Sequence, residues 1–198
     1  MDSLALTFSS GWASGVNAYL VVLVLGLGSR IGGVDDVPDV LARWDVLAVA
    51  GFLYAFEFVA DKIPLIDSTW DAISTVIRPT AGAVIGVLLA GDADSLDQAL
   101  NAAVGGGTAL VSHVIKAGGR LAINSSPEPV TNVTASVVED LVVLALVAFA
   151  IRHPVAAASI TAVLLLVGLG VLVLAIKVIR RGWRRFRARR ERRIVDTT

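Results

Sequence analysis

The stretch VAAASITAVLLLVGLGVLVLAIKVI, residues 155–179, contains one charged side chain and runs directly into RRGWRRFRARRERR, residues 180–193. A helix needs about 20 apolar residues to cross the hydrocarbon core of a bilayer. A basic segment that follows such a block lies on the cytoplasmic side, where positive residues accumulate. The two stretches therefore predict a membrane helix followed by a basic cytoplasmic tail.

Five shorter or less uniform apolar blocks precede this helix. They cover residues 4–27, 46–60, 80–90, 96–117 and 133–151. The chain of 198 residues is 56% hydrophobic, whereas soluble domains are typically about 45–50% apolar. This pattern predicts an all-α polytopic membrane protein with about six transmembrane helices. The absence of cysteine excludes disulfides and thiolate metal sites.

The formal net charge of zero conceals an uneven distribution. Residues 177–193 hold ten of the 17 basic residues and one acid, so the rest of the chain has seven basic and 16 acidic residues. Counting back from a cytoplasmic tail, six crossings place both termini in the cytoplasm. The basic residues Lys62, Arg78 and Arg120 then fall in or beside inner loops. We expect the tail to bind anionic lipid headgroups and see no need for a nucleic-acid partner.

A weak internal repeat divides the chain into two halves. Gly15, Gly28 and Arg30 recur at an offset of 90 as Gly105, Gly118 and Arg120. Three crossings per half is an odd number, so the halves would insert with opposite orientation, as in many secondary transporters. We therefore predict two inverted three-helix repeats, residues 1–92 and 93–180, followed by the basic tail at 181–198.

Two inner segments have patterns that differ from those of plain loops. Residues 61–78 place one apolar stripe at helical spacing, formed by Ile63, Ile66, Trp70, Ile73 and Ile77. This segment is predicted to be an amphipathic helix, either interfacial or re-entrant. Residues 124–132, NSSPEPVTN, contain two prolines that prevent a continuous helix. Both segments contribute candidate site residues.

Glu57 is the charge least expected at its position, because it ends a nearly uncharged block at residues 46–56. An ionisable group inside a membrane faces the bundle interior, a partner or water. We interpret Glu57 as a proton or cation site; the alternative is an interfacial acid paired with Lys62, Arg78 or a serine. Asp61 lies one helical turn later, and with Lys62 it is better explained as an ion pair at the water boundary.

Glu139 and Asp140 admit two interpretations. They follow Ser136 in the pattern Ser-x-x-Glu, which is typical of a capping box at a helix start. Alternatively, Glu139 is the repeat mate of Glu57. Both interpretations stay open at the level of sequence.

The segment SHVIKAGGR predicts a positive helix face. His113, Lys116 and Arg120 follow one another at spacings of three and four residues. Lys116 and Arg120 could simply extend toward the cytoplasmic surface. His113 lies deeper, where it would either titrate near neutral pH or hydrogen-bond a neighbour.

Small residues are expected to bring helices close together. Gly11 and Gly15 form a small-xxx-small pattern in the first block, beside the polar residues Ser14, Asn17 and Tyr19. Close packing explains this pattern better than a binding site. The glycines at 105–107 likewise allow a closely packed or broken helix.

Four stretches carry a resemblance to a known family. They are SGVNAYLVVLVLGLGSRIG, EFVADKIPLIDSTWDAISTVIRPTAGA, KAGGRLAINSSPEPVTN and SVVEDLVVLALVAFAIRHP. Over about residues 10–155 the chain resembles a bacterial membrane protein family catalogued as domain of unknown function 4126. The resemblance implies a small multi-pass protein of the bacterial inner (plasma) membrane. It carries no activity or residue roles with it.

Together these patterns favour a small transporter or channel-like protein with a carboxylate ion or proton site between inverted repeats. A small ion or anionic solute would bind there, and a homodimer is expected because one chain makes a thin pore. The candidate residues are Glu57, Asp61, Asp67, Asp71, Arg78, His113, Lys116, Arg120, Ser126, Glu128, Asn132, Glu139 and Asp140. We expect no cofactor and no enzymatic activity, and the sequence assigns no metal.

Two alternative functions follow from the same residues. In the first, the protein is a non-transporting scaffold or assembly factor whose charges form structural pairs. In the second, it is an intramembrane enzyme acting on a lipid phosphate with His113 and the acids as acid–base groups. No nucleophile, nucleotide or zinc motif is present, which disfavours the enzyme.

Overall fold

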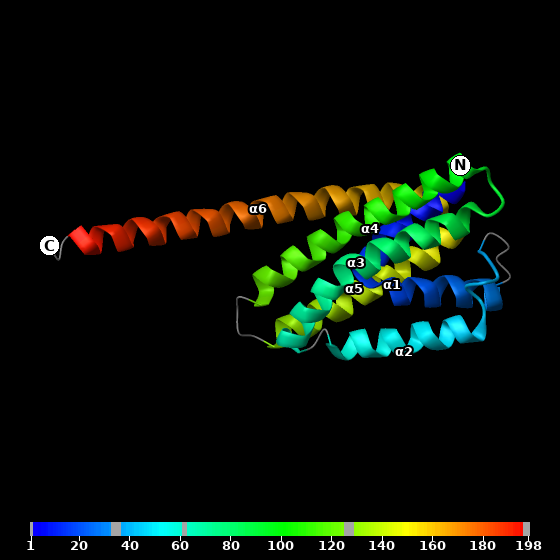
Figure 1. Cartoon of the computed structure of the whole chain (residues 1–198), viewed down its shortest axis with the longest axis horizontal. Helices are drawn as coiled ribbons and strands as arrows, with labels where there is room; N and C mark the ends of the chain where they lie inside the picture. The colour runs from blue at the N-terminus through cyan, green and yellow to red at the C-terminus, as the bar shows by residue number, and fades with distance from the viewer. Residues whose placement is uncertain (1, 33–36, 61–62, 125–128, 196–198) are drawn as a thin grey trace.

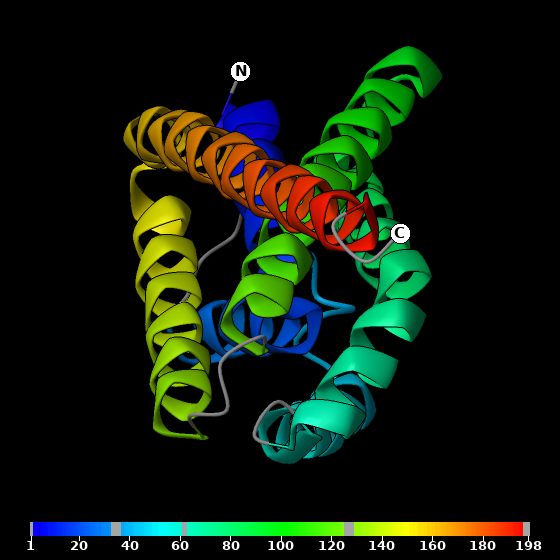
Figure 2. The same ribbon diagram turned by 90° about the vertical axis from the view of Figure 1, so that its left-hand side faces the viewer.

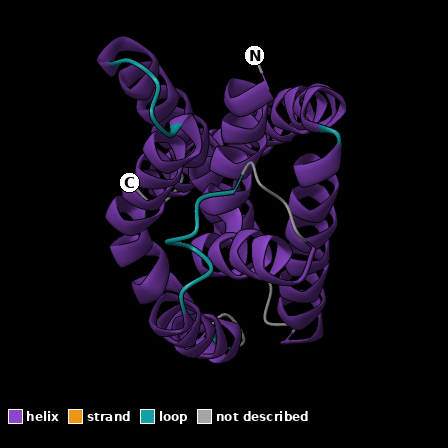
Figure 3. Cartoon of the chain, turned by 90° about the vertical axis from the view of Figure 1, so that its right-hand side faces the viewer, coloured by secondary structure: helices purple, strands orange, loops and turns teal. Residues whose placement is uncertain are grey.

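We describe the chain from a computed structural model. The structure describes residues 2–32, 37–60, 63–124 and 129–195, without the side chains of residues 2, 64, 65, 67, 68, 121–124, 129–132 and 182–195. The described part is a bundle of helices joined by loops and turns, as Figure 3 shows. The predicted all-α fold is confirmed for these residues.

Six helices follow one another in the described part of the chain (Figure 1). They are α1 (Asp2–Gly32), α2 (Trp44–Ala60), α3 (Pro64–Ala90), α4 (Ser95–Asn124), α5 (Pro129–Arg152) and α6 (Pro154–Val195). Proline stands at the first position of α3, α5 and α6, where its missing N–H has no intrahelical acceptor to lose. The apolar blocks predicted from the sequence all lie within these helices.

Helix α1 is broken at Asn17, whose backbone is extended (φ −153°, ψ 96°). The first half of α1 runs beside α4. Thr7 donates a hydrogen bond to Asn101 at 2.7 Å, and Lys116 donates one to the carbonyl of Val16 at 2.9 Å. Residue numbers rise together in these two segments, so the first half of α1 is parallel to α4.

The second half of α1 runs beside α5 instead. Asn17 donates a hydrogen bond to Asp140, and Gly28 packs against Ile151, so residue numbers again rise together. Helices α4 and α5 run in opposite directions (Figure 1), and the two halves of α1 therefore do so as well. Helix α1 reaches the middle of the bundle and returns toward the end where it began. This differs from the complete crossing expected for residues 4–27.

The break makes α1 the centre of the molecule. Viewed along the long axis, α1 lies between α3 and α5, with α6 across one side (Figure 2). Its apolar core residues are Leu6, Ala13, Val16, Leu20, Val21 and Leu25. They pack against core residues of α3, α5 and α6, including Ile85, Val147 and Ala157. A helix with several polar side chains among its apolar residues thus lies at the centre, with 67% of its most apolar stretch buried.

Glycines bring α1, α3 and α4 into close contact. A side chain at Gly11 or Gly15 would overlap the backbone of α4. Gly82 of α3 and Gly105 of α4 face each other so closely that neither position has room for a Cβ atom. The close packing predicted for the small-xxx-small pattern is confirmed. Helix α4 continues through Gly105 unbroken.

Helix α3 joins two regions that the sequence separated. Residues 64–78 are not a separate interfacial or re-entrant helix, because the helix runs through Pro79 to Ala90. Proline removes one backbone hydrogen bond, and packing of the next turns against α4 keeps the helix intact. The expectation for residues 61–78 is therefore corrected for the described part of that segment.

The apolar stripe of α3 faces outward. Ile66 and Ile73 are 43% and 48% exposed, whereas Asp71 and Arg78 are buried. The predicted helical stripe is confirmed, but its polar side faces the protein rather than water. A helix surrounded by lipid is expected to turn its polar side chains toward the protein and its apolar side chains toward the lipid.

Among the residues that the structure describes, four helices are long and apolar enough to span a membrane. They are α1, α3, α5 and α6. Helices α2 and α4 are not in this group. Helix α2 is short, with 17 residues, and the apolar stretch of α4 contains more polar residues. Helix α6 extends past the ends of α4 and α5, and the two termini lie at opposite ends of the long axis (Figure 1). Helices α1 and α4, which would correspond in the predicted repeat, differ in shape because only α1 is broken.

Candidate functional site

Charged side chains gather in the middle of the bundle, around the break in α1. Glu57 comes from α2, Arg78 from α3, His113 and Arg120 from α4, and all four are among the largest fully or nearly fully buried side chains. Burial of ionised groups is costly unless they are paired. Their partners therefore determine what the site can do.

Glu57 and Arg78 form the innermost ion pair. The Nη2 of Arg78 lies 2.5 Å from Oε1 of Glu57, and both side chains are 1% exposed. The Nη1 of Arg78 lies 3.5 Å from Asp71 and donates to the carbonyl of Gly15 at 3.3 Å. Arg78 thus connects two acids to the last turn of α1 before its break.

Lys116 joins the two acids that the sequence singled out. Its Nζ lies 3.8 Å from Glu57 and 3.5 Å from Glu139. It also donates to the carbonyl of Val16 at 2.9 Å. Arg120 donates to the same oxygen of Glu139 at 2.8 Å. Glu57 and Glu139, from different halves of the chain, therefore share one cation.

Asp140 is held by neutral donors. Asn17 donates its Nδ2 to Asp140 at 2.9 Å, and the Tyr54 hydroxyl donates at 3.3 Å. The Oδ1 of Asn17 accepts from the backbone N–H of Leu20 at 3.0 Å. Asn17 is thus the N-cap of the second half of α1. One side chain both starts that half-helix and binds the charged cluster.

His113 lies in a chain of hydrogen bonds. Its Nδ1 is 3.0 Å from Nη1 of Arg78, and its Nε2 is 3.0 Å from Oγ1 of Thr75. A guanidinium can only donate, so Nδ1 accepts and the ring proton resides on Nε2. Thr75 in turn donates to the carbonyl of Asp71 at 3.0 Å. Of the two roles left open for His113, the hydrogen-bonded one is observed.

The described cluster has a slight excess of acid. Four carboxylates (Glu57, Asp71, Glu139 and Asp140) face three basic side chains (Arg78, Lys116 and Arg120), a formal charge of −1 with His113 neutral. The predicted positive face of α4 is therefore matched by acids from α2, α3 and α5. Within the described residues, no three His, Asp or Glu side chains are grouped to hold a metal ion.

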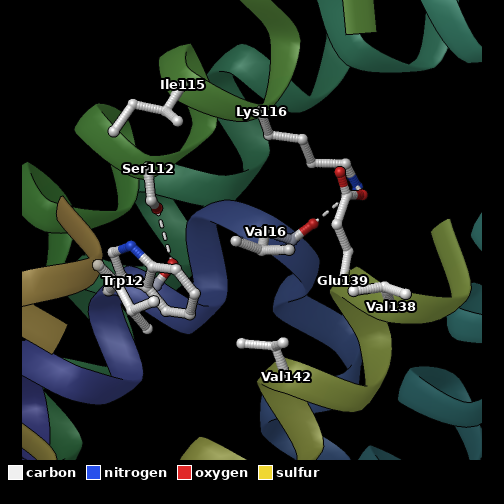
Figure 4. Close-up of a pocket in the computed structure, with 9 residues that line it drawn as sticks. Trp12, Val16, Ser112, Ile115, Lys116, Val138, Glu139 and Val142 are labelled. Carbon is white, nitrogen blue, oxygen red and sulfur yellow. Dashed lines mark hydrogen bonds and ion pairs between the residues drawn. The ribbon is translucent and has the colours of Figure 1, made fainter. Parts of the chain in front are cut away.

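Two cavities flank the break in α1. One, of about 240 Å³, is lined by Trp12 and Val16 before the break and by Lys116 and Glu139 (Figure 4). The other, of about 400 Å³, is lined by Tyr19 after the break and extends along α2 to the exposed Asp45. The two cavities therefore lie before and after the break, and of the two it is the first that is lined by residues of the charged cluster.

Eight of the predicted site residues come together in this cluster. They are Glu57, Asp71, Arg78, His113, Lys116, Arg120, Glu139 and Asp140. The remaining candidates lie outside the described residues: Asp61, Ser126 and Glu128 entirely, and Asp67 and Asn132 by their side chains. The capping-box interpretation of Ser136 and Glu139 is wrong, because α5 begins at Pro129 and Ser136 lies two turns inside it.

Three contributors to the cluster are not among the residues that the sequence predicts for it. In the sequence, Asn17 belongs to a segment that is interpreted as a close helix contact and not as a binding site. Tyr54 and Thr75 are not part of any pattern that predicts a site. Tyr54 lies three residues before Glu57 and so shares its helix face, a signal that the sequence does contain. The bond between Asn17 and Asp140 joins positions 123 residues apart, and no local pattern indicates it.

Comparison with known proteins places this architecture in one family. The family model described as domain of unknown function (DUF4126) matches residues 4–174. No curated protein and no solved structure matches the chain. The match covers helices α1 to α5 and most of the apolar part of α6, including the whole charged cluster. The chain therefore belongs to the DUF4126 family.

Proposed function

We propose that this protein is a small transporter or channel-like protein that moves a proton or cation through the charged cluster. The observation that carries the proposal is the broken helix α1 between two cavities, with its last carbonyls bound by Arg78 and Lys116. Broken helices at mid-depth, with backbone carbonyls facing a cavity, are typical of ion and substrate sites in transporters.

The bundle axis is proposed to lie along the membrane normal. Helices α2 to α6 then run across the membrane in alternating directions, and α1 enters to mid-depth and returns. Five crossings put the termini on opposite sides, consistent with their positions in Figure 1. A cytoplasmic basic tail gives the N-terminus an outer location, which replaces the six crossings and shared cytoplasmic termini expected from the sequence. The membrane is expected to be a bacterial plasma membrane.

A proton or cation suits the cluster better than the anionic solute first expected. Arg78, Lys116 and Arg120 already face carboxylates, so an anion would compete with the acids that hold each of them. Protonation of Glu57 would weaken its ion pair with Lys116. Glu139 would then be the ionised carboxylate that Lys116 contacts. Movement of Lys116 between the two acids would then be the step that carries charge through the cluster.

The proposal requires neither the inverted repeat nor a homodimer. Glu57 and Glu139 come from different halves but share Lys116 within one chain. A scaffold or assembly factor is the second candidate, favoured by the pairing of each basic side chain in the cluster. Structural pairs alone predict no flux, so one measurement separates the two functions.

Purified protein in liposomes loaded with a pH-sensitive dye tests the proposal. A potassium gradient with valinomycin sets the driving force, and we expect proton influx above that of empty liposomes. Glu57→Gln should reduce the rate to that of empty liposomes, because the amide cannot exchange a proton. Asp92→Asn, at an exposed loop acid, is the matched control and should keep the wild-type rate.

A second variant covers the case in which Glu57→Gln does not fold. Val49 lines the cavity beside Tyr19 and is 59% exposed, so Val49→Phe narrows the path without touching the cluster. It should lower the flux while the protein elutes from size exclusion as wild type does. Wild-type liposomes that match empty ones would refute transport. Well-folded variants that both match a conducting wild type would refute a path through Glu57 and this cavity.

A further inference from the structure

The cavity before the break in α1 opens toward the outside of the bundle. Val138 and Val142 of α5, Ile115 of α4 and Leu164 of α6 form its apolar walls, and Trp12 of α1 lies on one side (Figure 4). Val138 is 52% exposed and also lines the cavity, so the cavity reaches the outer surface that lipid would cover. A molecule could enter it directly from the bilayer.

Glu139 is the acid through which this cavity meets the charged cluster. Its side chain is 26% exposed, whereas that of Glu57 is 1% exposed. Arg120 and Lys116 both bind Oε2 of Glu139. The other oxygen, Oε1, accepts no hydrogen bond from the residues that the structure describes. A carboxylate that lines a cavity with one oxygen available is suited to accept from a donor or a cation.

Lys116 is poorly placed to receive an anion from the same cavity. Its Nζ already lies near three oxygens, those of Val16, Glu139 and Glu57, at 2.9, 3.5 and 3.8 Å. An incoming anion would approach two carboxylates to reach one ammonium, and like charges repel strongly at low dielectric. Of the charged groups that line the cavity, the one with an oxygen available is therefore the carboxylate of Glu139, which accepts from a positive ligand.

The remaining walls fit the body of an amphiphile. Trp12 offers an aromatic ring, and cations bind favourably over such rings. The aliphatic residues around it provide the mostly apolar lining typical of small-molecule sites. At about 240 Å³, the cavity suits a small ligand with one ring or a short chain.

We propose that this cavity binds a small amphiphilic ammonium ion that enters from the lipid, with its nitrogen at Glu139 and its apolar part against Trp12 and Leu164. The inference rests on the proposed function, because it names the substrate class of that transport site. Glu139 then has two sets of partners, the protein's own cations and the ligand's ammonium group.

Three probes with similar apolar bodies separate charge from hydrophobicity. Phenethylammonium is the cation, phenethyl alcohol the neutral analogue and 3-phenylpropanoate the anion. Binding to the purified protein in detergent is measured by titration calorimetry, with protein-free micelles as the blank. We expect the cation to bind about tenfold more tightly than either analogue, a difference of about 1.4 kcal/mol.

Two variants place the ligand in this cavity. Glu139→Gln should remove the preference for the cation while leaving weak binding of all three probes. Val142→Phe should weaken cation binding about tenfold by filling the apolar part, with the charged residues unchanged. Val76→Phe, at an exposed position of α3 that lines neither cavity, is the matched control and should bind the cation as wild type does.

The possible outcomes are distinct. Equal binding of the three probes would indicate a lipid-chain site, and a preference for the anion would make Lys116 the recognition group; either result overturns the inference. Unchanged cation binding in folded Val142→Phe does the same. Proton flux without cation preference refutes this inference alone, whereas specific binding without any flux refutes transport and leaves the site standing.

Discussion

Helices α1 and α6 show opposite relations between hydrophobicity and burial. In the most apolar 18-residue stretch of α1, 67% of the residues are buried. In the corresponding stretch of α6, no residue is buried. Yet α6 is the more uniformly apolar helix, and α1 carries serines, threonine and Asn17. In water the more apolar helix would be the buried one. Here the helix with polar groups within its apolar stretch lies at the centre, and the uniformly apolar part of α6 faces outward, where lipid would cover it.

The difference has a physical cause. Lipid solvates apolar side chains as well as a protein interior does, so α6 gains little by being covered. Polar groups and a broken backbone have no partners in lipid and must find them inside the protein. Asn17, Gly15 and Val16 find theirs in Asp140, Arg78 and Lys116. The charged cluster and the break in α1 therefore depend on each other.

The largest effect is expected from truncating matched leucines in the two helices. Leu25 of α1 is fully buried, and Leu166 of α6 is 71% exposed. Leu25→Ala should lower the free energy of unfolding by roughly 2–5 kcal/mol, because it leaves a cavity in the core. Leu166→Ala should change it by less than about 0.5 kcal/mol. Unfolding of detergent-solubilised protein with increasing SDS measures both.

The glycines of the two helices give a second, smaller contrast. Gly15→Ala places a methyl group against the backbone of Ala109 and should cost about 1–3 kcal/mol by overpacking. At Gly170 of α6, a Cβ atom would have no neighbour within 4 Å. Gly170→Ala should stabilise the helix by up to about 1 kcal/mol. The shift in thermal midpoint checks the opposite signs, and equal shifts would contradict the central position of α1.

Much of this architecture could be predicted from the sequence. Apolar blocks indicate the helices, and small residues indicate close helix packing without naming the partner helix. Glu57 stands out because a charge within an apolar helix needs a partner, whereas Arg78 and Lys116 are predicted at or near the cytoplasmic surface. Eight of the predicted site residues do converge, because charged and polar side chains of α2, α3, α4 and α5 find their partners in one another inside the bundle.

The course of α1 could not be predicted in the same way. A block of 24 apolar and small polar residues, 4–27, has the composition of a complete crossing. Its reversal depends on Asn17 meeting Asp140 from α5, a tertiary contact that hydropathy does not record. The extent of α3 is missed for a related reason, because Pro79 looks like a helix end until packing against α4 is known.

Asn17 itself provides the smallest and most specific test. Asn17→Ala removes both the cap on Leu20 and the bond to Asp140, and should cost about 1–2 kcal/mol. Asn17→Ser keeps a capping oxygen but cannot reach Asp140 in the same way, so it should recover about half of that loss. In α6, Ser159 donates to the carbonyl of Val155 at an exposed position, and Ser159→Ala is the matched control with little change expected. If Asn17→Ala matched Ser159→Ala in the SDS titration, the break in α1 would not depend on this side chain. The cause of the reversal would then have to lie in the carbonyls held by Arg78 and Lys116.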